Sequence, residues 1–247
     1  MKMHTFSVFL VLAALAFPAI SFAQKTADTD SAKPAVQVNQ FRPHVELGLS
    51  YGFGLNHTEI NTHYAYDYVY SDCPGFNPML SFVWQRKDWF GWRIDFSWID
   101  KGVLQTRAQE ATGMFAYMAS NKYFEVPVMA DFSFGGQRWR GHFDAGLYFG
   151  YWAKSNLIGV MDGVGDEVLN IYQYDEPYEF DSRRDNRFEM GYAASIGLSR
   201  LFGRHLRIQA EMALYYGITS TKVESRVVSD PVYNTTKVFN LGAYWCF

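Results

Sequence analysis

The side chains best able to take part in chemistry in this 247-residue chain are acidic and basic groups that alternate with apolar residues. Each therefore lies on the polar face of a segment whose other face is apolar. Carboxylates and cations gathered in this way can form structural ion pairs, or they can relay protons or cations. Because buried charges persist where they are paired, we favour an ion-pair network over a conducting path. The set comprises Glu46, Arg93, Asp95, Glu125, Asp131, His142, Asp144, Glu189, Arg207 and Glu211.

A second group of reactive side chains lies in one long polar segment and comprises His57, His63, Asp67 and Ser71. Surface acyltransferases and proteases of outer membranes use such residue types, since a nucleophile needs a base within hydrogen-bond reach. No recognisable motif connects these four residues, and their types are common in polar loops. We therefore expect no enzyme activity and no catalytic, cofactor-binding or metal site.

The elements that position these groups are strands, because apolar and polar residues alternate with a period of two. The apolar face is almost free of charge over about ten residues per strand, the height of a lipid-facing band. This pattern predicts an all-β fold: a transmembrane antiparallel up-and-down β-barrel of eight strands over residues 44–247. The expected strands are residues 44–55, 78–85, 91–100, 122–134, 141–152, 187–198, 206–217 and 238–247.

Alternation alone does not say which face points inward, so a soluble periplasmic barrel or sandwich is the alternative. The charged face also carries many glycines, which suits a narrow interior. An eight-stranded barrel is just wide enough to be filled by side chains, so we expect a filled lumen and no free-diffusion pore. The lumen residues expected to gather in its periplasmic half are Arg93, Asp95, His142, Asp144, Arg207 and Glu211.

The connections alternate between long and short, and in outer-membrane barrels the short turns are periplasmic. The third long connection is acidic, but its spacing is not that of an EF-hand, which favours a solvated loop. A hairpin over residues 168–174 would raise the number of strands to ten. Cys73 falls in an outer loop and Cys246 at the periplasmic rim, too far apart for a disulfide.

Tyrosines alternate within the first long connection, at Tyr64, Tyr66, Tyr68 and Tyr70. We expect them to extend the first two strands above the membrane, where the ladder packs the hairpin against itself. The alternative is an outward recognition surface, since tyrosine offers contact area at low entropic cost.

The two ends of the chain carry targeting features. Residues 1–23 read as a signal peptide, with Lys2 before an apolar run and a cleavage site near Ala23. Residues 24–43 are polar and aperiodic, which predicts a disordered periplasmic lead-in. The final strand resembles the terminal signal that outer-membrane barrels present to their insertion machinery, through Asn240, Gly242, Trp245 and Phe247.

The composition of the chain limits the kinds of partner that the protein can bind. The formal net charge is −3 and no basic stripe is present, which argues against nucleic-acid binding. Aromatic residues make up 18% of the chain, which suits rings placed at two membrane interfaces. We expect a monomer in outer-membrane lipid, with a structural or binding role and no cofactor.

Three segments resemble the PorT-like outer-membrane β-barrel family of Bacteroidetes. Lys122–Val128 is similar to its tyrosine–glutamate–proline strand, Asp95–Gly102 to a segment ending in lysine and glycine, and Ala145–Gly150 to its glycine–aromatic strand. Within the first, Pro127 is expected to mark a bulge, because proline cannot donate to the ladder.

The resemblance implies an eight-stranded barrel in the outer membrane. The founding member of the family is implicated in gingipain secretion, which makes an accessory role in an envelope secretion or transport assembly, with other envelope proteins as partners, the alternative function. A surface enzyme is third. Fold does not imply function, so the secretion role is not carried over to this chain.

Overall fold

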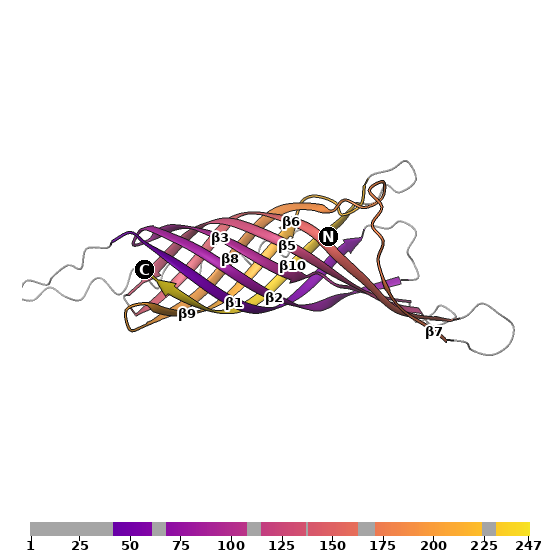
Figure 1. The fold of residues 1–247 in the computed structure, drawn as a ribbon, viewed down its shortest axis with the longest axis horizontal. Coiled ribbons are helices and arrows are strands. Elements are labelled where there is room, and N and C mark those ends of the chain that lie inside the picture. Colours follow the sequence, from indigo (N-terminus) through magenta and orange to yellow (C-terminus); the bar gives the residue numbers. More distant parts are fainter. Residues whose placement is uncertain (1–41, 61–67, 108–114, 137, 163–170, 224–230) are drawn as a thin grey trace, which may run out of the picture. The chain divides into compact units, whose positions relative to one another are not determined.

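The computed structural model describes residues 42–60, 68–107, 115–136, 138–162, 171–223 and 231–247, which form ten antiparallel strands (Figure 1). The predicted signal peptide and most of the predicted lead-in lie outside these ranges. Within them, no helix is long and apolar enough to cross a membrane. The strands are β1 (His44–Ile60), β2 (Tyr68–Lys87), β3 (Phe90–Asp100), β4 (Val103–Arg107), β5 (Phe115–Gly135), β6 (Trp139–Asp162), β7 (Ile171–Pro177), β8 (Phe188–Phe202), β9 (Leu206–Gly217) and β10 (Val232–Cys246).

Eight of these strands close into a ring in the order β1-β2-β3-β5-β6-β8-β9-β10. The last strand returns to the first, and their pairing runs from Glu46 with Cys246 to Ile60 with Val232. Every ring strand lies beside the ring strands that precede and follow it along the chain. The predicted eight-stranded up-and-down barrel is therefore confirmed.

Two short strands extend the wall beyond the ring. After a break at Lys101 and Gly102, β4 continues the path of β3 and pairs with both β2 and β5. β7 pairs with the end of β6, from Asn156 with Pro177 to Asp162 with Ile171. The sequence left open a hairpin over residues 168–174. Residues 168–170 fall outside the described residues, and β7 pairs with β6 and adds no strand to the ring. Figure 1 shows β7 at the end of the barrel opposite the carboxyl terminus.

The strands run further on the long-loop side than the alternation predicted. β2 begins at Tyr68 instead of residue 78, and β5 begins at Phe115 instead of residue 122. In these segments the outward side chains are no longer uniformly apolar, although the backbone hydrogen bonds between strands continue. Strand prediction from apolar alternation therefore does not include them. Tyr68 and Tyr70 lie in β2, whereas Tyr64 and Tyr66 fall outside the described residues.

Two further local expectations need correction. Cys73 is buried within β2, where it pairs with Asn56, and does not lie in a loop. Pro127 marks no bulge: it pairs with Tyr148 in the regular β5–β6 ladder. The pairing of β5 with β3 instead skips this position and resumes in the same register at Glu125, because proline lacks the donor. The β5–β6 register shifts at Lys122 and Tyr123.

The two faces of the wall have the orientation that the alternation predicted. Along β1, Leu49 is 70% exposed on the outside, whereas Glu46 is 1% exposed on the inside. The same contrast holds on β10 between Leu241 on the outer face and Asn240 on the inner face. A soluble barrel would place its apolar face inward, so that alternative is ruled out.

Glycines on the inner face leave room for tyrosine rings. A Cβ on Gly48 would lie 2.3 Å from the ring of Tyr244 on the neighbouring strand. A Cβ on Gly191 would lie 2.5 Å from the ring of Tyr148 and 2.1 Å from a backbone oxygen of Tyr216. The small residues of the polar face are therefore the space into which large lumen side chains fold.

The orientation of the wall gives a first prediction. Met212 lies near the middle of the outward positions of β9 and is 64% exposed. Met212→Arg should lower the free energy of unfolding by about 2–4 kcal/mol, because it places a charge near the bilayer midplane. Urea titration in lipid vesicles, read by heat-modifiable gel mobility, measures this loss. The control Lys237→Arg keeps a charge already on the outer face and should cost nothing; equal stabilities would contradict the lipid-facing assignment.

Candidate functional site in the barrel lumen

A buried arginine holds the middle of the lumen together. The Arg93 guanidinium donates from Nε to Asp95 Oδ1 at 2.9 Å and from Nη1 to Asp144 Oδ2 at 2.8 Å. It also donates to both carboxylate oxygens of Glu211, with Nη2 3.2 Å from Oε1. These partners come from β3, β6 and β9, so one side chain ties separate parts of the wall together. We call these four residues the Arg93 cluster.

Neutral side chains complete the Arg93 cluster. Ser195 Oγ donates to Asp144 at 2.7 Å, and Gln209 Nε2 donates to Glu211 at 2.9 Å. Asn240 Nδ2 also lies within hydrogen-bond distance of Glu211, at 3.3 Å. One cation therefore faces three carboxylates whose remaining lone pairs are partly satisfied by uncharged donors.

Nearer the short turns, the lumen residues form separate pairs. Arg207 pairs with Glu46, whose other oxygen lies 2.9 Å from His44 Nε2. His142 Nε2 lies 2.6 Å from Ser199 Oγ, and its Nδ1 lies 3.4 Å from Asp131. Of the six residues expected in one periplasmic group, four therefore form the Arg93 cluster, while Arg207 and His142 belong to pairs of their own.

A second buried cation lies nearer the long loops. Lys101 Nζ is 2.6 Å from Glu125 Oε1 and 2.5 Å from Glu189 Oε1, and Lys101 is fully buried. The same ammonium lies about 5 Å from the ring centroids of Tyr123 and Tyr148, which adds cation–π attraction. Tyr148 also donates its hydroxyl to Glu189 at 2.5 Å.

The alternation of charged and apolar residues does not predict Lys101 as a lumen residue, because the predicted strand ends at Asp100. The chain breaks its ladder at Lys101 and Gly102, and the lysine side chain turns into the lumen at that break. A Cβ on Gly102 would lie 2.6 Å from Cys73 Sγ, so glycine suits this position. The signal that could have revealed Lys101 was the lysine–glycine end of the family-like segment Asp95–Gly102.

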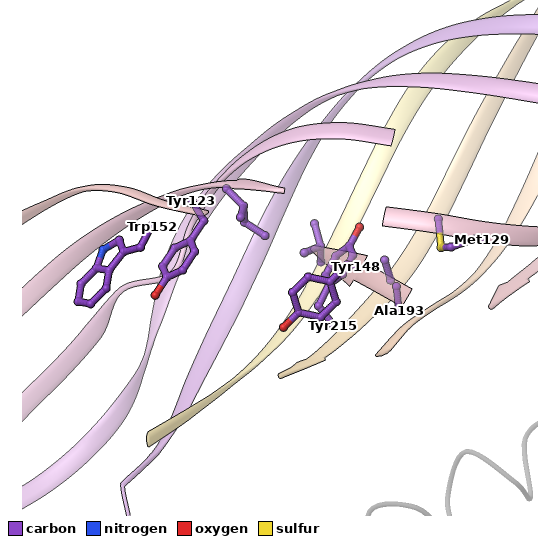
Figure 2. Close-up of a cluster of buried hydrophobic side chains, with 9 residues drawn as sticks. Tyr123, Met129, Tyr148, Trp152, Ala193 and Tyr215 are labelled. Carbon is purple, nitrogen blue, oxygen red and sulfur yellow. The ribbon is translucent and has the colours of Figure 1, made fainter. Parts of the chain in front are cut away.

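Aromatic side chains fill the lumen between and above the two cations. The rings of Tyr148 and Tyr215 meet edge to face at 5.6 Å, and Trp152 stacks on Tyr123 at 5.8 Å with an interplanar angle of 5°. Figure 2 shows these two pairs within one buried cluster. The lumen is thus filled by alternating ionic and aromatic layers.

The segment between β7 and β8 folds back onto this cluster. Tyr178 stacks on Trp152 at 5.9 Å, and Phe180 meets Trp152 edge to face at 5.0 Å. The Arg187 guanidinium lies 4.2 Å from the Phe180 ring centroid. We call Trp152, Tyr178 and Phe180 the aromatic cap, because they cover the long-loop end of the lumen cluster.

Asp185 anchors the aromatic cap. Its carboxylate accepts hydrogen bonds from the Tyr178 hydroxyl at 2.8 Å and from the Asp181 amide at 3.0 Å. Burial raises the pKa of Asp185, but these hydrogen bonds, together with Arg184 and Lys222, outweigh burial and hold the pKa below its ordinary value. Burial and the bond to Asp185 together raise the pKa of Tyr178 to about 12.

The residues considered for catalysis are not brought together. His57 Nδ1 lies 2.7 Å from Asp72 Oδ1 on the exposed ends of β1 and β2, and no hydrogen bond within the described ranges joins His57 to Ser71. His63 and Asp67 fall outside the described residues. No group of three or more His, Cys, Asp or Glu residues suited to a metal occurs in the part of the chain that the structure describes. Cys73 and Cys246 are free thiols.

The residues of the expected insertion signal lie on β10 and just after it. Asn240 points inward to Glu211, whereas Trp245 is 51% exposed on the outer face. Phe247 is also exposed, and its amide donates to Val45 at 2.9 Å. The terminal aromatic residues therefore lie on the lipid side at the short-turn end, where Trp245 stacks on His205.

A sequence model of the outer membrane protein beta-barrel domain matches residues 73–223, which is more than half of the chain. The chain belongs to this family. It is an outer-membrane β-barrel protein. A search of curated protein sequences returns no match.

Solved barrels resemble the chain at low identity. Neisserial surface protein A from Neisseria is 11% identical over 81% of this chain and 97% of its own, with a TM-score of 0.44. OprG from Pseudomonas aeruginosa is 10% identical over 84% and 98%, with a TM-score of 0.46. Ail, the attachment invasion locus protein of Yersinia pestis, is 17% identical over 82% and 98%, with a TM-score of 0.39.

The Arg93 cluster predicts an asymmetry between its members. Arg93→Leu should lower the free energy of unfolding by about 3–5 kcal/mol, because it leaves three buried carboxylates without their cation. Asp144→Asn should cost less than about 1 kcal/mol, because Arg93 keeps two carboxylates and an amide can still accept from it. Urea titration of both variants in lipid vesicles tests this order. Equal losses would show that Arg93 is not the centre of the cluster.

The aromatic cap predicts a dependence on pH. Because the pKa of Asp185 is lowered in the folded protein, its contribution is complete above the ordinary carboxyl pKa and is lost as the pH falls through the lowered value. Amide hydrogen exchange of residues 178–187, corrected for its intrinsic pH dependence, should therefore accelerate in acid. Asp185→Asn should remove this response, whereas Asp175→Asn, on exposed β7, should retain it. A response that survives in Asp185→Asn would exclude Asp185 as its source.

Proposed function

We propose that this outer-membrane barrel is a sealed, non-conducting monomer with a structural and binding role. The observation that carries the proposal is the filled lumen, where the Arg93 cluster, the Lys101 ion pairs and the aromatic cap follow one another along the barrel. A conducting pore needs a continuous wet path, and these layers leave little room for one. The carboxylate excess then serves to hold the wall together and not to pass cations.

The binding part of the proposal rests on the wall beyond the ring. There β4 and β7 widen the sheet on the long-loop side, which in outer-membrane barrels faces the outside of the cell. A hollow of about 460 Å³ is lined by residues of β4, β5, β6 and β7, among them Leu104, Met118 and Ile158. An apolar hollow on a rigid sheet is a suitable place for contact with another molecule.

The resemblance to the PorT-like family supports an accessory role in an envelope assembly as a second form of the same proposal. The segment Lys122–Val128 lies in β5. Its inward residues Tyr123 and Glu125 contact Lys101 in the lumen, and its outward residues Phe124 and Val128 lie on the lipid-facing side. A secretion partner would therefore contact other residues, and the long-loop side is the surface available for it.

Electrical recording tests the sealed state. The refolded protein in planar lipid bilayers should show no discrete conductance steps, because ion pairs and aromatic rings fill its lumen. An open porin reconstituted in the same way is the positive control, and heat-modifiable mobility verifies that the sample is folded. Regular single-channel steps from the folded protein would overturn the proposal and would restore the cation path as the function of the lumen carboxylates.

A further inference from the structure

The lumen opens into a cavity of about 310 Å³ at the short-turn end, and the cavity is strongly basic. Five arginines line it, and short turns of outer-membrane barrels face the periplasm. None of the lumen layers described above needs all of these cations. The five are Arg42, Arg138, Arg140, Arg204 and Arg207.

Only part of this positive charge is balanced. Arg207 pairs with Glu46, and Arg140 Nη1 lies 2.8 Å from Asp88 Oδ1. The other three arginines form no ion pair with any residue of the described ranges. The guanidinium groups therefore outnumber the carboxylates that pair with them around this cavity, which Phe247 at the carboxyl terminus also lines.

The cavity reaches from the short turns into the lumen. Two of the residues that line it are buried: Arg207 is 6% exposed and Gln85 is 3% exposed. Gln85 Nε2 donates to Ser133 Oγ at 2.8 Å and to the carbonyl oxygen of Lys87 at 3.2 Å. The inner end of the cavity is therefore a fixed part of the barrel, while the unpaired arginines lie at its exposed end.

We propose that this cavity binds a phosphate group. Guanidinium groups bind phosphate through paired hydrogen bonds, and Arg42, Arg138 and Arg204 form no ion pair within the described residues. The tetrahedral oxygens of a phosphate group can accept from several arginines at once, whereas a carboxylate offers only two oxygens. The phosphate is carried either by a soluble phosphate monoester or by a lipid headgroup at the periplasmic leaflet.

Calorimetry on the full chain, refolded in a non-ionic detergent, tests the site with inorganic phosphate as the probe. Phosphate should bind saturably. Arg138→Gln with Arg204→Gln should weaken phosphate binding by roughly tenfold or more, since each substitution removes a charged donor from the cavity. Both arginines are exposed and unpaired in short turns, so the fold should survive, and heat-modifiable mobility verifies it.

Two arginines at the same end of the barrel provide a matched control. Arg86 stacks on Trp84, and Arg200 lies over Trp139, all on the outer face. Arg86→Gln with Arg200→Gln removes the same charge outside the cavity and should leave phosphate binding unchanged. The proposal is overturned if phosphate fails to saturate, if the cavity variant binds as tightly as the wild type, or if both variants lose binding equally.

Vesicles distinguish the two sources of phosphate. The barrel is reconstituted in a zwitterionic lipid with or without phosphatidic acid, whose headgroup carries a phosphate monoester. If phosphatidic acid lowers the apparent affinity for inorganic phosphate, the headgroup occupies the cavity. If the affinity is unchanged, the ligand is soluble. Either result supports a phosphate site once the cavity variant has shown the loss.

Discussion

A lumen too narrow for bulk water is the constraint on which the rest of this structure depends. Eight strands enclose a space that side chains must fill, and polar groups within it must find partners inside the barrel. Arg93 meets this requirement by pairing with Asp95 on its own strand and with Asp144 and Glu211 on two other strands. Residues far apart in the chain are thus coupled through the interior, while their neighbours in sequence face lipid.

The outer side of the wall follows a simpler rule, and only over part of its height. Within the lipid band, outward positions are apolar because an unpaired charge there is costly. Beyond the band the ladder continues through polar segments, and β4 and β7 join it. The outward side chains of this extension consequently need not be apolar, while its backbone remains part of the sheet. A lipid-facing wall and a surface beyond the lipid band therefore share the same strands.

Much of the barrel follows from the sequence, because lipid and lumen demand opposite side chains on the two faces of every strand. The period of two identifies the ring strands, their faces and the lumen set from Glu46 to Glu211. It does not reveal β4, Lys101 or the aromatic cap. Lys101 lies at a break in the ladder, and Tyr178 contacts Trp152 from an irregular segment, so neither obeys a strand period.

Which of the charged lumen residues pair with each other could not be predicted from the sequence either. The expected periplasmic group divides because pairing depends on which inward residues meet across the barrel, and that depends on strand stagger. Arg207 and Glu211 both lie on β9, but Arg207 pairs with Glu46 of β1, whereas Glu211 pairs with Arg93 of β3. Alternation places a residue on a face, but it does not say which residue on the opposite wall lies at the same depth.

The seam between β1 and β10 has a consequence for how the protein resists unfolding. Until that seam closes, the sheet is open and water reaches Arg93, Lys101 and their carboxylates. Opening the seam later would rehydrate the interior and separate the aromatic layers in one event, with few stable stopping points between. The closed barrel should accordingly persist for long times by a high barrier to opening, whatever its equilibrium stability.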